Sequence, residues 1–267
     1  MKKINKSLPP NPLTDFYTSN KDGTWDDFRN HLLSNSYNQT KEIIFQDQDG
    51  LCGYCEDYLL GLDKSQRQIE HFHDKSDKDL SVTNWALDWN NVFGVCKGGS
   101  DQGAIYPTPR NLSCDAHKNH YLKSAQTEGV YINPLDAPYA PIFDFDKATG
   151  RLKPNIAICD TLNSYAPNNY QNFRELVEKT IDILNLNCDR LTSNRLKVLH
   201  EHNRLIEQAR KKNNPNMLKR LPEHWLRNKS LPFFTVRRCL LGSAAEEYLI
   251  SSGAYPLVNI SVHDKNR

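Results

Sequence analysis

The chain has 267 residues, a formal net charge of +2, 38% hydrophobic residues and 25% charged residues. These values are typical of a globular protein, and no apolar run approaches the roughly 20 residues that a membrane helix requires. The basic N-terminal residues also lack the apolar segment of a secretory signal. We therefore expect a cytoplasmic protein.

The chain order suggests three parts, at residues 1–45, 46–131 and 132–267. In the first part, the Pro- and Asn-rich residues 1–15 predict an irregular arm, and hydrophobic spacing predicts helices at 25–33 and 40–48. The central part consists of short apolar pieces, glycines and polar turns, with little helical period. It has too few regular elements to form a large core of its own.

The third part begins with apolar segments at 130–132 and 142–145 that predict strands. Apolar residues at helical spacing then predict helices over 170–187 and 191–209. The short gap between these two helices predicts an antiparallel pair. A further helix is expected at 236–251, before Gly253.

Seven cysteines, an odd number, favour metal ligands or small core residues over disulfides in a reducing compartment. Cys52 and Cys55 have the C-x-x-C spacing at which two thiolates bind one tetrahedral zinc ion. Cys96 and Cys114 lie further along the same module and supply two more sulfurs. The sequence therefore predicts a structural zinc site, with His117 or His120 as an alternative for one thiolate. A redox C-x-x-C is the competing interpretation, but no βαβ pattern surrounds it.

Histidines, carboxylates and amides lie between and beside these cysteines. In a strand over residues 69–74, His71 and His73 would share one face and Glu70 and Asp74 the other. Asn90 and Asn91 precede an apolar segment that ends at Cys96, and Asp115 follows Cys114. This order resembles the HNH nuclease signature, whose ββα-metal module binds one divalent cation between a hairpin and a helix.

The similarity extends over most of residues 45 to 200, to the HNH endonucleases of Septu and retron-associated anti-phage defence systems (PtuB-like). It is carried by CGYCED, IEHFHDKS, LDWNNVFGVC, CDAHK, YINPL and TIDILNLNCDRLTSNR, in that order. The chain departs from the family at His73-Asp74, where Arg-Pro is usual. His73 thereby becomes an additional candidate ligand.

The resemblance implies an α+β fold with a zinc-stabilised HNH module at 46–131, between mainly helical N- and C-terminal parts. It aligns His71 with the first His, Asn91 with the Asn and Asp115 with the final His of the signature. His71, whose ordinary pKa is about 6.5, is then the expected base. Glu70, Asn91 and Asp115 are the expected oxygen ligands of Mg²⁺ or Mn²⁺.

The residues themselves leave several of these roles open. Asn91 can instead hold His71 through its amide, Asn90 is an equally available amide, and Asp115 can serve as a helix cap. His73 and His120 can be solvated or lie behind the ligands. His71 can also be a zinc ligand.

Charge is distributed unevenly along the chain. Residues 189–238 carry 13 Lys and Arg against four Asp and Glu, a net charge of +9, whereas residues 52–123 carry eight against ten, a net charge of −2. This predicts cation binding in the central module. The basic helices bind nucleic acid or a partner, or are simply solvated.

The implied activity is metal-dependent cleavage of nucleic acid, with DNA as the expected substrate. The resemblance also implies a PtuA-like ATPase as partner, joined in retron systems by a reverse transcriptase and its small DNA. One alternative is an effector that cleaves RNA, such as a tRNA. Another is a non-catalytic zinc-knuckle module that binds nucleic acid or a partner, in which the cysteines matter and Glu70, His71 and Asp115 do not.

Overall fold

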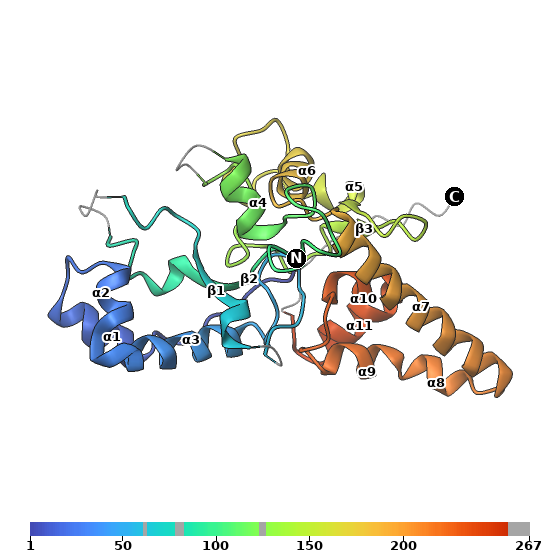
Figure 1. The fold of residues 1–267 in the computed structure, drawn as a ribbon. Helices are drawn as coiled ribbons and strands as arrows, with labels where there is room; N and C mark the ends of the chain where they lie inside the picture. Colours follow the sequence, from blue (N-terminus) through green and yellow to red (C-terminus); the bar gives the residue numbers. More distant parts are fainter. Residues whose placement is uncertain (61–62, 78–82, 123–126, 256–267) are drawn as a thin grey trace.

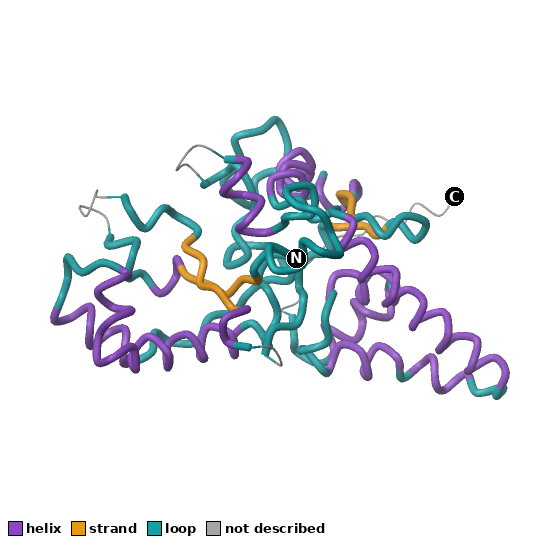
Figure 2. Tube along the Cα trace, viewed as in Figure 1, coloured by secondary structure: helices purple, strands orange, loops and turns teal. Residues whose placement is uncertain are grey.

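The computed structural model describes residues 1–60, 63–77, 83–122 and 127–255 (Figure 1). The fold is α+β, as expected: short strands lie near the centre, and helices extend to either side (Figure 2). None of the helices in these ranges is long and apolar enough to cross a membrane.

The N-terminal helices are α1 (Asn11–Ser19), α2 (Trp25–Asn30), the 3₁₀ turn η1 (His31–Ser34) and α3 (Asn35–Asp47). The prediction of an irregular arm is wrong from Asn11 onward, because a proline in the first turn is compatible with a helix. A capping box between Thr24 and Asp27 starts α2. The expected helix stops three residues early, since Leu32 and Leu33 have positive φ, and the Leu33 side chain is 98% exposed.

A hairpin forms the centre of the molecule. The 3₁₀ turn η2 (Lys64–Gln66) leads into β1 (Arg67–His71), and η3 (Trp89–Asn91) leads into β2 (Val92–Cys96). The strands are antiparallel, with Glu70 opposite Phe93 and His71 opposite Val92. Helix α3 packs on β2.

Helix α4 (Cys114–Tyr121) follows the hairpin after a long loop and packs against β2. A second two-stranded sheet pairs β3 (Phe143–Phe145) with β4 (Leu152–Pro154). The segment 130–132, predicted as a strand, is a turn and loop without ladder pairing. A hairpin, a following helix and a four-cysteine cluster are the parts expected of an HNH-type module.

The C-terminal part is helical, and the order of its elements is α5 (Ile156–Cys159), α6 (Phe173–Ile183), α7 (Asp189–Lys211), α8 (Pro215–Lys219), α9 (Leu221–Arg227), α10 (Phe234–Leu241) and α11 (Ser243–Ser251). The predicted antiparallel pair is wrong: α6 packs on α4, α5 and β4, whereas α7 packs on α8 and α10. The single helix expected at 236–251 is two helices, because the chain turns at Gly242 with a φ of 58°.

One continuous apolar core joins the central module to the C-terminal helices. It contains Phe45, the four cysteines of the module, Phe93 and Tyr131, and it continues through α6 and α7 to Trp225 and Leu240. A separate cluster lies among the N-terminal helices and reaches Val92 of β2. The hairpin is therefore packed from both sides.

Candidate functional site

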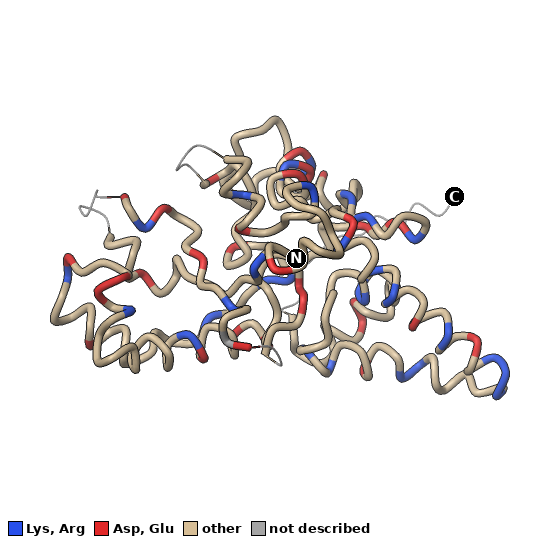
Figure 3. The backbone as a smooth tube through the Cα atoms, in the orientation of Figure 1, with Lys and Arg blue, Asp and Glu red and all other residues tan. Residues whose placement is uncertain are grey.

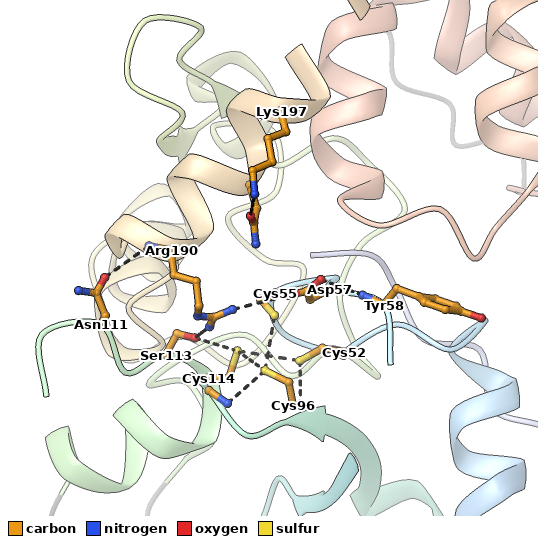
Figure 4. A network of polar contacts seen from close by, with 12 residues as sticks. Cys52, Cys55, Asp57, Tyr58, Cys96, Asn111, Ser113, Cys114, Arg190 and Lys197 are labelled. Atoms are coloured by element: carbon orange, nitrogen blue, oxygen red, sulfur yellow. Dashed lines mark hydrogen bonds and ion pairs between the residues drawn. The ribbon is translucent and has the colours of Figure 1, made fainter. Parts of the chain in front are cut away.

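The four cysteines Cys52, Cys55, Cys96 and Cys114 meet in the core. Their ligand atoms all lie within 4.8 Å of one another, and all four residues are buried. The sulfur–sulfur distances are 3.9 Å for Cys52–Cys114 and 3.7 Å for both Cys55–Cys96 and Cys96–Cys114. A tetrahedral ion with bonds of about 2.3 Å requires sulfurs about 3.8 Å apart. The cluster therefore has the geometry of a closed four-thiolate metal site (Figure 4).

A glycine turn brings Cys114 back to Cys96 across the long loop between them. Gly98 has a φ of +64°, and a Cβ atom there would lie 2.2 Å from the carbonyl oxygen of Ser113. The Ser113 amide donates to the Gly98 carbonyl, and the Gly98 amide donates to the Cys96 sulfur at 3.3 Å. Only glycine fits this close approach. The loop between Cys96 and Cys114 therefore begins and ends at the cysteine cluster and leaves its geometry intact.

Two buried arginines of α7 lie beside the sulfur cluster. Arg190 donates to the Ser113 hydroxyl at 2.7 Å, lies 3.6 Å from Asp57 and points its guanidinium towards the cysteines (Figure 4). Burial lowers the pKa of Arg190, but the negative charge of Cys55, Cys96 and Cys114 outweighs it and raises the pKa. Arg195 is 1% exposed, and burial lowers its pKa to about 10. Their charges balance those of ionised thiolates.

A carboxylate pair forms between β1 and α4. Glu70 and Asp115 both contact the ammonium of Lys118, which lies 3.0 Å from Asp115. The hydroxyl of Tyr54 donates to Glu70 at 3.3 Å. The pKa of Glu70 is raised, first by burial and second by the charge of Asp115, while Lys118 works in the opposite direction. The pair offers oxygen ligands for a cation, and Lys118 balances its charge.

His71 lies on the opposite face of β1 from Glu70, as neighbouring strand residues do. Its ring meets Trp25 edge-on at 4.7 Å, and its Nε2 donates to the carbonyl oxygen of Ala86 at 3.1 Å. A carbonyl can only accept, so the proton is on Nε2, and Nδ1 carries a lone pair that has no hydrogen-bond partner among the described residues. Burial lowers the pKa of His71 to about 4, which keeps the ring neutral at neutral pH and makes it a weaker base than a solvated imidazole.

The predicted site residues do not form a single metal-binding group. Within the described ranges, the four cysteines are the one set of three or more His, Cys, Asp or Glu residues with ligand atoms close enough to share an ion. Glu70 and Asp115 come together through Lys118, and His71 belongs to neither group. A complete divalent-cation site would need further ligands from water and substrate, as Mg²⁺ sites often do.

The Asn91 side chain holds the loop that follows β1. Its Oδ1 accepts from the backbone amide of His73 at 2.7 Å, and its Nδ2 donates to the carbonyl oxygens of His73 and Trp85 at 3.0 and 2.8 Å. Asn91 is buried, whereas Asn90 is exposed. The amide therefore sets the shape of the chain next to His71.

The remaining histidines lie apart from the sulfur cluster. His73 stacks on Trp85 at 4.1 Å and hydrogen-bonds Glu128 and Asp77. Although its partial burial works against protonation, these two carboxylates raise the pKa of His73. His117 donates from Nδ1 to the carbonyl oxygen of Ile183, and His120 is exposed. Neither replaces a thiolate.

Sequence reasoning missed three polar partners of these groups: Lys118, Tyr54 and Arg190. Lys118 stands three residues after Asp115 in CDAHK, and Arg190 lies in TIDILNLNCDRLTSNR, so each lies inside a segment that carried the resemblance. The i, i+3 spacing of Asp115 and Lys118 on a helix was the available signal for their ion pair. The positions of Tyr54 and Arg190 depend on long-range packing.

Comparisons with known proteins give the family of the chain. None of the protein-family models matches the chain. A protein of Escherichia coli named "Retron Ec83 putative HNH endonuclease" is 37% identical to it over 224 residues, which cover 82% of this chain and 86% of that protein. Similarity of this extent means that the chain belongs to the retron-associated HNH endonuclease family that this relative represents.

Proposed function

We propose that the chain is a metal-dependent endonuclease that hydrolyses phosphodiester bonds, with DNA as its preferred substrate. The observation that carries the proposal is that a neutral His71, whose Nδ1 has no hydrogen-bond partner among the described residues, follows directly in β1 on a carboxylate that pairs with Lys118 and Asp115 on the other face of the strand. These are the base and the oxygen ligands that such hydrolysis requires.

We assign the roles of the chain's own residues as follows. His71 takes the proton of the attacking water at Nδ1, while its Nε2 stays hydrogen-bonded to Ala86. Glu70 and Asp115 bind Mg²⁺ or Mn²⁺, which neutralises charge on the leaving oxygen when bound. Asn91 keeps the chain after His71 in place, or adds its oxygen to the cation. When no cation is bound, the ammonium of Lys118 pairs with both carboxylates and holds them together.

We also propose that Zn²⁺ occupies the four-cysteine cluster and has a structural role. Four thiolates in tetrahedral geometry favour zinc over Mg²⁺ or Mn²⁺, which prefer oxygen ligands. Two buried arginines place positive charge beside the net charge of −2 that four thiolates and one Zn²⁺ would carry. A closed site of this kind leaves no position for substrate.

The name of the Escherichia coli relative supports a retron context, and the family resemblance supports a PtuA-like ATPase as partner. We propose that the chain is the nuclease of such an anti-phage complex, with the retron reverse transcriptase and its small DNA as further components. The basic helices α7 to α9 would supply affinity for the phosphate backbone.

A non-catalytic binding module is the second candidate, and one observation favours it. Lys118 already neutralises Glu70 and Asp115, and His71 faces Trp25 instead of the carboxylates. On this alternative the zinc site and the helices bind nucleic acid or a partner, and no bond is cleaved.

The test compares His71→Ala with His120→Ala, which removes an exposed histidine from α4. Cleavage of DNA and of RNA is measured with Mg²⁺ or Mn²⁺, with and without the candidate ATPase, alongside zinc content and binding. We expect His71→Ala to lose cleavage by at least about 100-fold with binding unchanged, and His120→Ala to behave as wild type. Equal activity of the two variants, or no cleavage by the wild-type complex, would support the binding module. Cleavage of RNA alone would replace DNA as the substrate.

A further inference from the structure

A cavity of about 290 Å³ opens beside the end of β1. Its walls come from three separate stretches of the chain: the two ends of the β1–β2 connection, residues 128–138 and residues 166–176. The aromatic side chains Phe72, Trp85, Tyr131 and Phe173 contribute to these walls, with Ile132, Pro138, Ala166, Pro167 and Leu176 as the aliphatic part. The cavity is therefore largely apolar, and it is open at one side.

One wall of the cavity adjoins the carboxylate pair. Tyr131 lines the cavity, and its ring lies 5.0 Å from that of Phe72 and 6.3 Å from that of Tyr54. Tyr54 in turn donates to Glu70. The hydroxyl of Tyr131 is buried and has no hydrogen-bond partner among the described residues. A ligand in the cavity would be separated from the candidate cation site by this side chain.

The polar side chains that line the cavity are carboxylates, amides and the imidazole of His73, which hydrogen-bonds Glu128. Asp88, Glu128 and Asp136 line it, and its lining contains no Lys or Arg. Asp88 accepts from the backbone amide of Asn90 and Asp136 from the side-chain amide of Asn133, each through one carboxylate oxygen; the other oxygen of each has no hydrogen-bond partner among the described residues. Such a lining repels phosphate and favours a flat, apolar ligand with N–H donors at its edge.

We infer that this cavity binds a nucleobase of the substrate, next to the bond that is cleaved. A base offers a π face to apolar and aromatic walls and exocyclic amino groups to carboxylates. A base enters only if it is unstacked, so the site selects single-stranded or distorted nucleic acid over regular duplex. The inference rests on the proposed nuclease function and adds a substrate preference to it.

The test fills the cavity without touching the proposed catalytic residues. Ala166→Trp places a large side chain at its wall, and Ala148→Trp makes the same change in the exposed turn between β3 and β4. Affinity for a short single-stranded oligonucleotide is measured without divalent cation, together with melting temperature and zinc content. We expect about tenfold weaker binding in Ala166→Trp and no change in Ala148→Trp. Equal affinity of the two variants would overturn the inference.

An abasic substrate gives a second, independent measurement. Removing the base beside the cleaved bond is expected to weaken binding to the wild-type protein, but to cause no further loss in Ala166→Trp, because both changes remove the same contact. Additive losses would overturn the inference. Where Ala166→Trp lowers the melting temperature, Trp85→Leu replaces it with the same expectation. Binding is read without cleavage, so a wild-type protein that cleaves nothing would refute the proposed function while the cavity is still tested.

Discussion

At the scale of single residues, the buried amide of Asn91 stabilises the backbone beside β1, whereas the neighbouring Asn90 is exposed. Three hydrogen bonds from this buried side chain hold the backbone of His73 and Trp85. In Asn91→Ala these backbone groups lose their partners, at a cost of roughly 3 kcal/mol in the free energy of unfolding. Urea denaturation measures this, with Asn90→Ala as the exposed control. Equal stability of the two variants would show that the hydrogen bonds of Asn91 do not stabilise the fold.

His71 makes the stability of the fold depend on pH. Its pKa is lowered to about 4 in the folded chain, against about 6.5 when unfolded. Between these values the unfolded chain binds more protons, so stability is complete above pH 6.5 and falls as the pH drops towards 4. At pH 5 the loss due to His71 is roughly 2 kcal/mol.

Denaturation of wild type, His71→Gln and His120→Gln at pH 7 and pH 5 isolates this effect. We expect the difference between the two pH values to shrink in His71→Gln and to stay the same in His120→Gln, since His120 is exposed. If His71→Gln keeps the full pH dependence, the ring is not held neutral by burial. The same low pKa predicts that the His71 ring is still unprotonated at pH 6.

At the scale of elements, the local patterns of the sequence identified most long helices and the cysteine ligands. The periodicities at 170–187 and 191–209 correspond to α6 and α7, and the four sulfurs meet as expected. Local patterns failed where the same residue type permits two structures. The prolines that suggested an arm sit in the first turn of α1, and Gly242 divides a helix that hydrophobic spacing alone would continue.

Relations between elements were harder to predict, because they depend on packing of distant segments. The short gap between α6 and α7 suggested a hairpin, yet their apolar faces pack on different neighbours. Strand alternation correctly separates Glu70 from His71, but only the fold shows that Glu70 faces α4 and His71 faces Trp25. The sequence therefore indicated which residues are candidates for the site, but it did not predict how they are arranged in space.

Arg190 links the cysteine cluster to helix α7, and this gives a prediction for the affinity of the proposed zinc site. Its positive charge lies beside the thiolates, and outer-sphere partners of metal ligands typically change affinity by 10- to 100-fold. Arg190→Met should therefore bind Zn²⁺ at least about tenfold more weakly. Competition with a chromogenic chelator measures the affinity. Arg204→Met, an exposed change on the same helix, is the control, and equal affinities would contradict the link.

At the scale of the whole molecule, charge and chemistry are separated. The carboxylate pair and the cysteine cluster belong to the central module, and the cavity opens beside its strand β1. Lys and Arg positions recur along α7 to α9, at the far end of the backbone (Figure 3). Residues 203–230 contain eight Lys and Arg against two Asp and Glu. In this stretch the structure pairs Arg227 with Glu223, and the other described basic residues have no acidic partner. The basic helices would then attract phosphates in one part of a substrate, while the central part would cleave a bond in another part of it.

This separation predicts how salt affects binding. Replacing Arg210, Lys211 and Lys212 by Gln removes three exposed charges from the end of α7 and the residue after it. If each contacts a phosphate of duplex DNA, the slope of log affinity against log salt should fall by up to about 3.

Lys147, Arg151 and Lys153 in and beside the β3–β4 turn are also exposed, so replacing them by Gln changes the net charge equally. Equal effects of the two triple variants would mean that only net charge matters. A reduced slope in the α7 variant alone, with cleavage of very short substrates unchanged, would place the phosphate contacts on these helices, because a short substrate in the central site does not reach them.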